Sequence, residues 1–77
     1  MQSRLSCYLN IIYLNMSWIV EIPSNMYVQD FINLLQTQFA HDIQGIYLFE
    51  LKTNRILDPK ITFDQNNIQS GDYLYFI

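Results

Sequence analysis

The sequence predicts an α+β domain in which a mixed sheet of four to five strands carries one amphipathic helix packed on one face. Alternating apolar residues fill residues 5–22 and residues 73–77, which is the period of half-buried strands. Between them, residues 28–39 have the 3.6-residue apolar period of a helix. We expect residues 1–77 to form a single domain, because a chain of 77 residues has room for one modest core.

Two strands at the start of the chain are predicted to form a hairpin. From Leu5 to Tyr13 the odd-numbered residues are uniformly apolar and the even-numbered ones are mixed, which predicts one buried face. Residues 18–22 resume the alternation, and the polar residues 15–17 predict the turn. Residues 15–17 also match the N-glycosylation sequon, a pattern that often arises by chance, and we interpret them only as a turn.

A helix is predicted directly after the second strand. Pro23 ends that strand because proline donates no ladder hydrogen bond, and Ser24 and Asn25 are residue types that cap helices. Asp30 then lies near the N-terminal end of the helix dipole, where a carboxylate is favourable. About three turns are expected. The apolar stripe that would face the sheet consists of Val28, Phe31, Ile32, Leu35 and Phe39.

The second half of the chain predicts three more strands and an irregular loop. The strands are expected at residues 46–52, 55–57 and 73–77, with a turn at residues 53–54. In the loop, Ile68 is predicted to fill part of the core. Gly71 is expected to take a positive φ in the turn before the last strand.

This order of elements predicts one particular topology. If the first and last strands pair in parallel at the centre of the sheet, each has a hairpin partner outside it, and the helix supplies the crossover that a parallel pair requires. That arrangement is the β-grasp, or ubiquitin-like, topology. The segments 22–24, 57–58 and 67–76, the last with the pattern I-x-x-G-D-x-L, resemble recurrent features of ubiquitin-like domains, and the resemblance extends from Leu5 over nearly the whole chain.

Within that superfamily the chain resembles the YukD/EsaB family, small cytoplasmic ubiquitin-like proteins encoded with the type VII (WXG100) secretion systems of low-GC Gram-positive bacteria. The resemblance consists of the length, the I-x-x-G-D-x-L close and a final strand that ends at Ile77 without Gly-Gly. It implies a bacterial accessory or regulatory protein that binds components of the secretion machine. Ubiquitin and the sulfur carriers act through a Gly-Gly tail, so conjugation and sulfur carriage are the less favoured alternatives.

The charge and the cysteine content of the chain argue against some classes of binding partner and favour one cellular compartment. Four basic residues and a net charge of −3 do not provide the cationic surface that nucleic acid or anionic lipid requires. No apolar run approaches the length of a transmembrane helix. The one cysteine, Cys7, has no intramolecular partner, which favours a reducing compartment. We expect a cytoplasmic protein with protein partners, without nucleic acid and without membrane insertion.

No group of residues predicts catalysis, a cofactor or a metal. His41 stands beside Asp42, but the candidate nucleophile, Cys7, lies on the apolar parity of the first strand, where a free cysteine is usually a core residue. His41 itself is more typical of a solvated residue or a helix C-cap. The seven acidic residues are scattered singly, whereas a metal site requires clustered ligands. We therefore expect that the protein is not an enzyme and that it binds neither a cofactor nor a metal ion.

The face of the sheet opposite the helix is the predicted binding site. If Leu74 and Phe76 point to the helix, the alternate residues of that strand and its neighbours point away. The residues with this outward parity are mostly apolar or tyrosine, so we expect an apolar face rich in tyrosine, a residue favoured at interfaces. Only 14% of all residues are charged, which leaves the surface unusually neutral. The predicted protein-interaction patch consists of Tyr8, Ile12, Tyr47, Phe49, Tyr73, Tyr75 and Ile77. A homodimer formed through this patch, or through the edge of the second strand, is the alternative.

Overall fold

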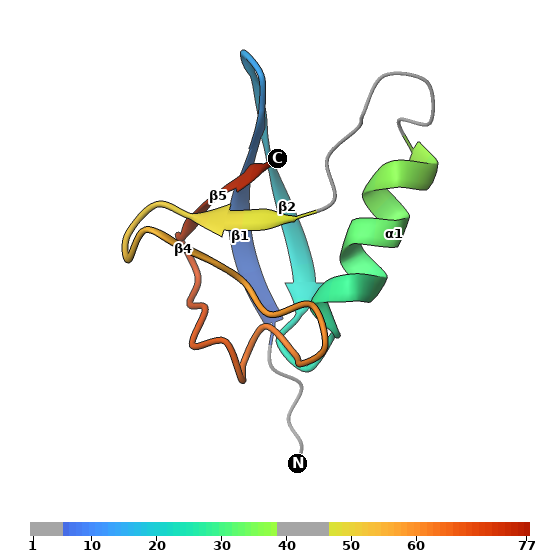
Figure 1. Cartoon of the computed structure of the whole chain (residues 1–77), viewed down its shortest axis with the longest axis vertical. Helices are drawn as coiled ribbons and strands as arrows, with labels where there is room; N and C mark the ends of the chain where they lie inside the picture. Colours follow the sequence, from blue (N-terminus) through green and yellow to red (C-terminus); the bar gives the residue numbers. More distant parts are fainter. Residues whose placement is uncertain (1–5, 39–46) are drawn as a thin grey trace.

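The computed structural model describes residues 6–38 and 47–77, which form a five-stranded mixed sheet and a helix (Figure 1). The elements are β1 (Ser6–Tyr13), β2 (Met16–Pro23), α1 (Val28–Gln38), β3 (Leu48–Glu50), β4 (Arg55–Ile56) and β5 (Tyr73–Phe76). The strand order is β2-β1-β5-β3-β4. β1 and β5 are parallel, and the other neighbours are antiparallel, so the predicted topology is confirmed.

The β1–β2 hairpin is longer than the sequence predicted. All eight residues of β2 pair with β1, from the pair Ser6 and Pro23 to the pair Tyr13 and Met16. Residues 16 and 17, predicted as part of the turn, therefore belong to β2, and the turn is reduced to residues 14–15. Leu14 takes a φ of 56°, a conformation that a two-residue turn between strands requires but leucine rarely adopts. Leu5 lies outside the described residues.

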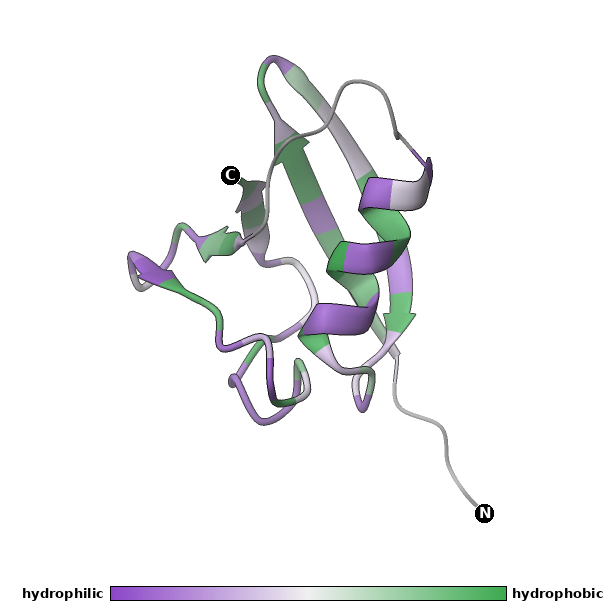
Figure 2. Ribbon diagram, turned by 45° about the vertical axis from the view of Figure 1, so that its right-hand side comes forward, coloured by the Kyte–Doolittle hydropathy of each residue, from purple (hydrophilic) through white to green (hydrophobic). Residues whose placement is uncertain are grey.

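The helix presents the predicted apolar stripe to the sheet, and Figure 2 shows apolar and polar bands alternating along α1. The buried helical residues are Val28, Phe31, Ile32 and Leu35. Phe39, the last residue of the predicted stripe, lies outside the described residues. These side chains pack against the inner face of the sheet, where Leu9, Ile11, Leu48 and Leu74 are fully buried.

The start of α1 differs from the prediction. The helix begins at Val28, beyond Ser24 and Asn25, so these two residues do not hold the N-cap position. The backbone N–H groups of Val28 and Gln29 instead donate to the carbonyls of Ile61 and Pro59, at 3.1 Å each. The irregular loop between β4 and β5 therefore satisfies the first turn of the helix, a long-range contact that local sequence does not encode.

The same loop completes the core. Phe63 is fully buried and meets the ring of Phe31 edge-on, with the centroids 5.6 Å apart. Ile68 is buried as predicted. Asn66 holds the loop together, because its side-chain amide donates to the carbonyls of Asp58 and Thr62 and its oxygen accepts from the Asp58 N–H, all within 2.9–3.1 Å.

The three strands in the second half of the chain are shorter than predicted. β3 covers three residues, because Leu51 and Lys52 already belong to the turn that leads to β4, and β4 covers only two. Ile46 lies outside the described residues. β5 ends at Phe76, although Ile77 still exchanges two backbone hydrogen bonds with Tyr47, at 2.9 and 3.0 Å.

One carboxylate is buried within the sheet. Glu50 is 1% exposed because its parity on β3 points inward. Its Oε1 accepts hydrogen bonds from Thr53 Oγ1 at 2.7 Å and from Arg55 Nε at 3.0 Å. Arg55 also donates to the carbonyl of Asn66, so the β3–β4 hairpin is linked to the loop through this charge. A buried carboxylate is tolerated only with such partners.

Removing the cation should therefore destabilise the fold. We expect Arg55→Met to lower the free energy of unfolding by about 2–3 kcal/mol, because it leaves the Glu50 charge buried beside a neutral side chain. Lys60→Met is the matched control, since the Lys60 side chain is exposed and forms no ion pair within the described part of the chain, and it should cost less than about 1 kcal/mol. Urea unfolding followed by Trp18 fluorescence measures both, and equal losses would contradict the prediction.

Candidate protein-interaction face

The alternation of β5 determines which of its side chains point away from the helix. Leu74 and Phe76 are buried in the core, whereas Tyr73 is 53% exposed, Tyr75 36% and Ile77 53%. The structure thus places these three residues on the side of the sheet opposite α1, as the sequence predicted.

The register of the strands arranges the predicted residues into rows. In the central row, Tyr75 lies between Ile12 of β1 and Phe49 of β3. Phe49 is in turn opposite Ile56 of β4. Directly opposed residues on neighbouring strands share a face and are close enough to touch, so these four apolar side chains form one continuous stripe across four strands.

Two further rows lie beside the central one. Tyr73 is opposite Asn10 on β1, and its carbonyl accepts a hydrogen bond from the Leu51 N–H at 3.2 Å. On the other side, Tyr47 and Ile77 are joined by their two backbone hydrogen bonds. Tyr8 lies farther along β1, where it is more than half exposed.

All seven predicted residues therefore lie on the same face of the sheet. Three other apolar residues that are exposed on this face were not predicted: Leu51, Ile56 and, on β2 opposite Asn10, Ile19. Leu51 has the same odd parity as Tyr47 and Phe49 and could have been included on that signal. The position of Ile56 depends on the register of the β3–β4 hairpin, for which the sequence gives no local signal. We call the seven residues together with Leu51 and Ile56 the outer face.

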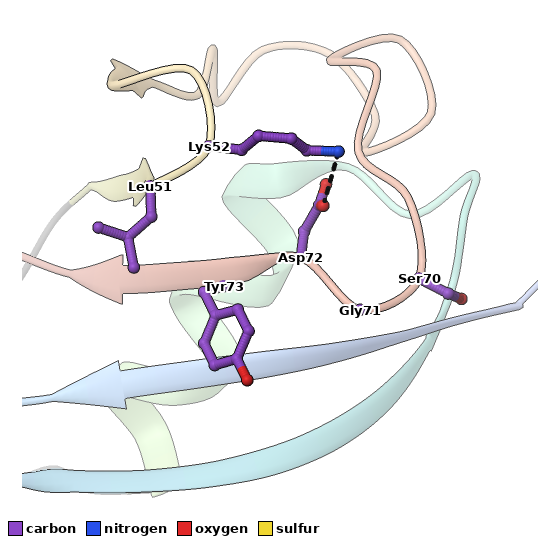
Figure 3. Close-up of a pocket in the computed structure, with 6 residues that line it drawn as sticks. All are labelled: Leu51, Lys52, Ser70, Gly71, Asp72 and Tyr73. Atoms are coloured by element: carbon purple, nitrogen blue, oxygen red, sulfur yellow. Dashed lines mark ion pairs between the residues drawn. The ribbon is translucent and has the colours of Figure 1, made fainter.

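A pocket of about 440 Å³ opens at one end of the outer face (Figure 3). Leu51 and Tyr73 border it on the apolar side, and the Lys52 ammonium lies 3.4 Å from Asp72 Oδ1 on the polar side. The other Asp72 oxygen accepts a hydrogen bond from the Gln69 N–H at 2.9 Å. The pocket thus has an ion pair on one side and exposed apolar side chains on the other.

The turn beneath this pocket is fixed by hydrogen bonds to β1. The Gly71 N–H donates to the Tyr8 carbonyl at 2.7 Å, and the Tyr8 N–H donates to Ser70 Oγ at 3.1 Å. Gly71 has the predicted positive φ, 95°, and an added Cβ would meet nothing within 4 Å, so its backbone conformation alone favours glycine. The turn therefore places Asp72 and Tyr73 at the start of β5.

The chemistry of Cys7 agrees with a core role. Its side chain is buried, and burial raises the pKa of the thiol, which the carboxylates of Asp64 and Asp72 raise further and a hydrogen bond with Ser70 partly lowers. A thiol with a raised pKa is protonated at neutral pH and is a poor nucleophile. His41 and Asp42, the other predicted candidates, lie outside the described residues.

Within residues 6–38 and 47–77, no group of three or more His, Cys, Asp or Glu side chains is arranged to hold a metal ion. In the same part of the chain, no helix has the length and apolar character needed to cross a membrane.

The raised pKa of Cys7 predicts how stability changes with pH. Above about pH 8.5 the thiol of the unfolded chain loses its proton while the folded thiol retains it, so its contribution to stability declines as pH rises toward the folded pKa. We expect the difference in unfolding free energy between wild type and Cys7→Ala to be constant from pH 6 to 8 and to shrink from pH 8.5 to 10. Urea titrations across this range test it, and a difference that grows with pH would contradict it.

Comparison with solved structures identifies the fold. A designed protein based on ubiquitin matches with a TM-score of 0.73 and 18% sequence identity, over 94% of this chain and 87% of that chain. The EccD5 ubiquitin-like domain from Mycobacterium xenopi matches with a TM-score of 0.71 and 13% identity, over 95% of this chain and 93% of that chain. No protein-family model and no curated protein sequence matches this chain. Identities this low show the fold alone, which is the ubiquitin-like β-grasp predicted from the sequence.

The outer face has the composition of a protein interface. It is made of exposed tyrosines and aliphatic residues, and tyrosine and apolar surface are enriched at such interfaces.

Proposed function

We propose that this protein is a non-enzymatic ubiquitin-like binding module that acts as an accessory or regulatory component of a type VII secretion system. It works by protein–protein contact through the outer face. The observation that carries the proposal is the continuous apolar stripe formed by Ile12, Tyr75, Phe49 and Ile56, with exposed tyrosines on both sides.

The composition of this face suits a partner that docks by burial of apolar area. Exposed patches of several hundred Å² that are apolar at the centre and polar at the rim typically mark interaction sites. Tyr73 and Tyr75 combine a large ring with a hydroxyl that can remain hydrated at the rim or donate a hydrogen bond. The same sheet face contains few charges, with Glu21 of β2 opposite Tyr8, so we expect binding to depend weakly on salt.

Two features support the secretion context. The sequence resembles the YukD/EsaB family in its closing I-x-x-G-D-x-L pattern. The fold also matches the EccD5 ubiquitin-like domain over nearly the full length of both chains. We further propose that the protein works in the cytoplasm, on the basis of its single buried thiol, and that its partners are components of the secretion machine.

Removing the ring from two central positions should abolish binding. We expect the double variant Phe49→Ser/Tyr75→Ser, introduced into the native cells, to reduce export of WXG100 proteins as much as deletion of the gene does. The reason is that both side chains lie in the centre of the stripe, where truncation is most costly to binding. Secreted WXG100 protein is measured by immunoblot against a cytoplasmic loading control.

The matched control places the same kind of change on the other side of the molecule. Tyr27→Ser/Leu34→Ser removes an exposed tyrosine and an exposed aliphatic residue at and on α1, away from the outer face, and should leave export unchanged. Circular dichroism and urea unfolding of the purified variants check that both fold. If deletion leaves WXG100 export intact, the secretion role is wrong; if the outer-face variant supports export like the control, the binding face is wrong.

A further inference from the structure

The sheet has two edges that differ in length. β4 closes one side with only two residues, whereas β2 forms the other side with eight. Short strands, internal lysine or proline residues and bulges are the usual protection of an edge against pairing with another chain. β2 lacks these features: its residues pair with β1 in unbroken one-to-one register, its proline is the last residue, and its only charged side chain is Glu21.

The hydrogen bonds of β1 show which backbone groups of β2 point to the open edge. On β1, the Asn10 N–H donates to Asp72 and the Tyr8 carbonyl accepts from Gly71, so the even-numbered residues of β1 direct their backbone toward β5. Its odd-numbered residues consequently direct theirs toward β2, where they are opposite even-numbered residues.

The odd-numbered residues of β2 must therefore direct their N–H and C=O groups away from β1. They are Ser17, Ile19 and Glu21, and none of them has a backbone partner beyond β2 within the described part of the chain. The Pro23 carbonyl accepts from the Met26 N–H, and proline has no N–H, so the open ladder ends there. Ile19 is the central residue of the three and is 69% exposed.

We propose that this edge pairs with β2 of a second copy of the chain, antiparallel and around a two-fold axis that passes between the two Ile19 residues. In this register Ile19 is opposite Ile19 of the second copy, and Ser17 is opposite Glu21 of the second copy. Every outward N–H and C=O of the three residues then has a partner. The result is one sheet of ten strands that runs through both copies.

The register is selected by the residues themselves. A register shift of two residues toward the turn pairs Ser17 with Ile19 and leaves Glu21 opposite Asn15, outside the strand. A shift the other way places Ser17 opposite Pro23, which has no N–H to donate. The centred register also keeps the two Glu21 carboxylates apart, each facing a serine hydroxyl, and places Trp18 opposite Val20, an aromatic and β-branched pair that is favourable across strands.

This pairing is independent of the proposed secretion role, because it uses the edge of the sheet and leaves the centre of the outer face uncovered. We expect the purified full-length chain to show a reversible monomer–dimer equilibrium by sedimentation equilibrium, with a dissociation constant in the micromolar to millimolar range. Ile19→Lys should raise that constant at least tenfold, equal to about 1.4 kcal/mol, because it places two like charges directly opposite each other.

Ile56→Lys is the matched control, since Ile56 is also an exposed isoleucine on an edge strand but lies on the short edge. It should leave the dissociation constant within about twofold of wild type, a difference below 0.5 kcal/mol. Phe49→Ser/Tyr75→Ser should also remain dimeric, which separates edge pairing from association through the outer face.

Disulfide cross-linking tests the register. In a hydrogen-bonded antiparallel pair the Cα atoms are about 5.5 Å apart, a separation that a disulfide can span. Ile19→Cys should therefore cross-link under mild oxidation. Ser17→Cys should not, because the two copies of residue 17 would be about 14 Å apart along the ladder. Wild type controls for Cys7, whose thiol is buried.

Four results would overturn the proposal. A chain that stays monomeric to about 1 mM would show that the open edge does not pair with a second copy. Species larger than a dimer would show that the pairing does not close around a two-fold axis. A dimer that Ile19→Lys leaves intact, or equal cross-linking of the two cysteine variants, would show that the copies meet elsewhere or in another register.

Discussion

The parallel pairing of β1 with β5 is the contact on which the rest of the structure depends. It joins strands from opposite ends of the chain, and it places Ile11 beside Leu74 in the core and Ile12 beside Tyr75 on the outer face. The turn at Gly71 secures it through hydrogen bonds to Tyr8 that span more than sixty residues of sequence. Because this pairing closes a loop that contains every other element, we expect it to form late and to be the slow step of folding.

Features that follow from alternation could be predicted from the sequence. Parity alone separates Leu74 from Tyr75, and the 3.6-residue period identifies the buried side of α1. Contacts between distant segments could not be predicted in this way. The first backbone N–H groups of α1 donate to the carbonyls of Pro59 and Ile61, and the identity of neither residue predicts that contact.

The candidate site shows the same division. The outward positions on β1, β3 and β5 follow from alternation, whereas their alignment into rows depends on register, which is a property of paired strands. Ile56 was omitted for that reason. For Glu50, alternation does indicate an inward position, but a carboxylate is not expected in a core. Its burial is explained only by Arg55, which donates a hydrogen bond to it across the hairpin. The turn at Leu14 also depends on strand pairing. Extending the ladder to Met16 shortens the turn to residues 14–15 and gives hydrogen-bond partners to backbone groups that a longer turn would leave unpaired.

The outer face and the β2 edge lead to a joint consequence. A two-fold axis between two antiparallel copies of β2 stands perpendicular to the sheet, so the outer faces of both copies would lie on the same side. Pairing at the edge would therefore not cover the stripe around Tyr75 but would present it twice. A partner with two docking segments, or a partner that is itself a symmetric oligomer, would then bind with an effective concentration set by the spacing of the two stripes, and its apparent affinity would rise with dimer formation. Ile19→Lys should accordingly weaken binding to a bivalent partner while leaving the affinity of a single docking segment unchanged, because that substitution lies at the axis and outside the stripe.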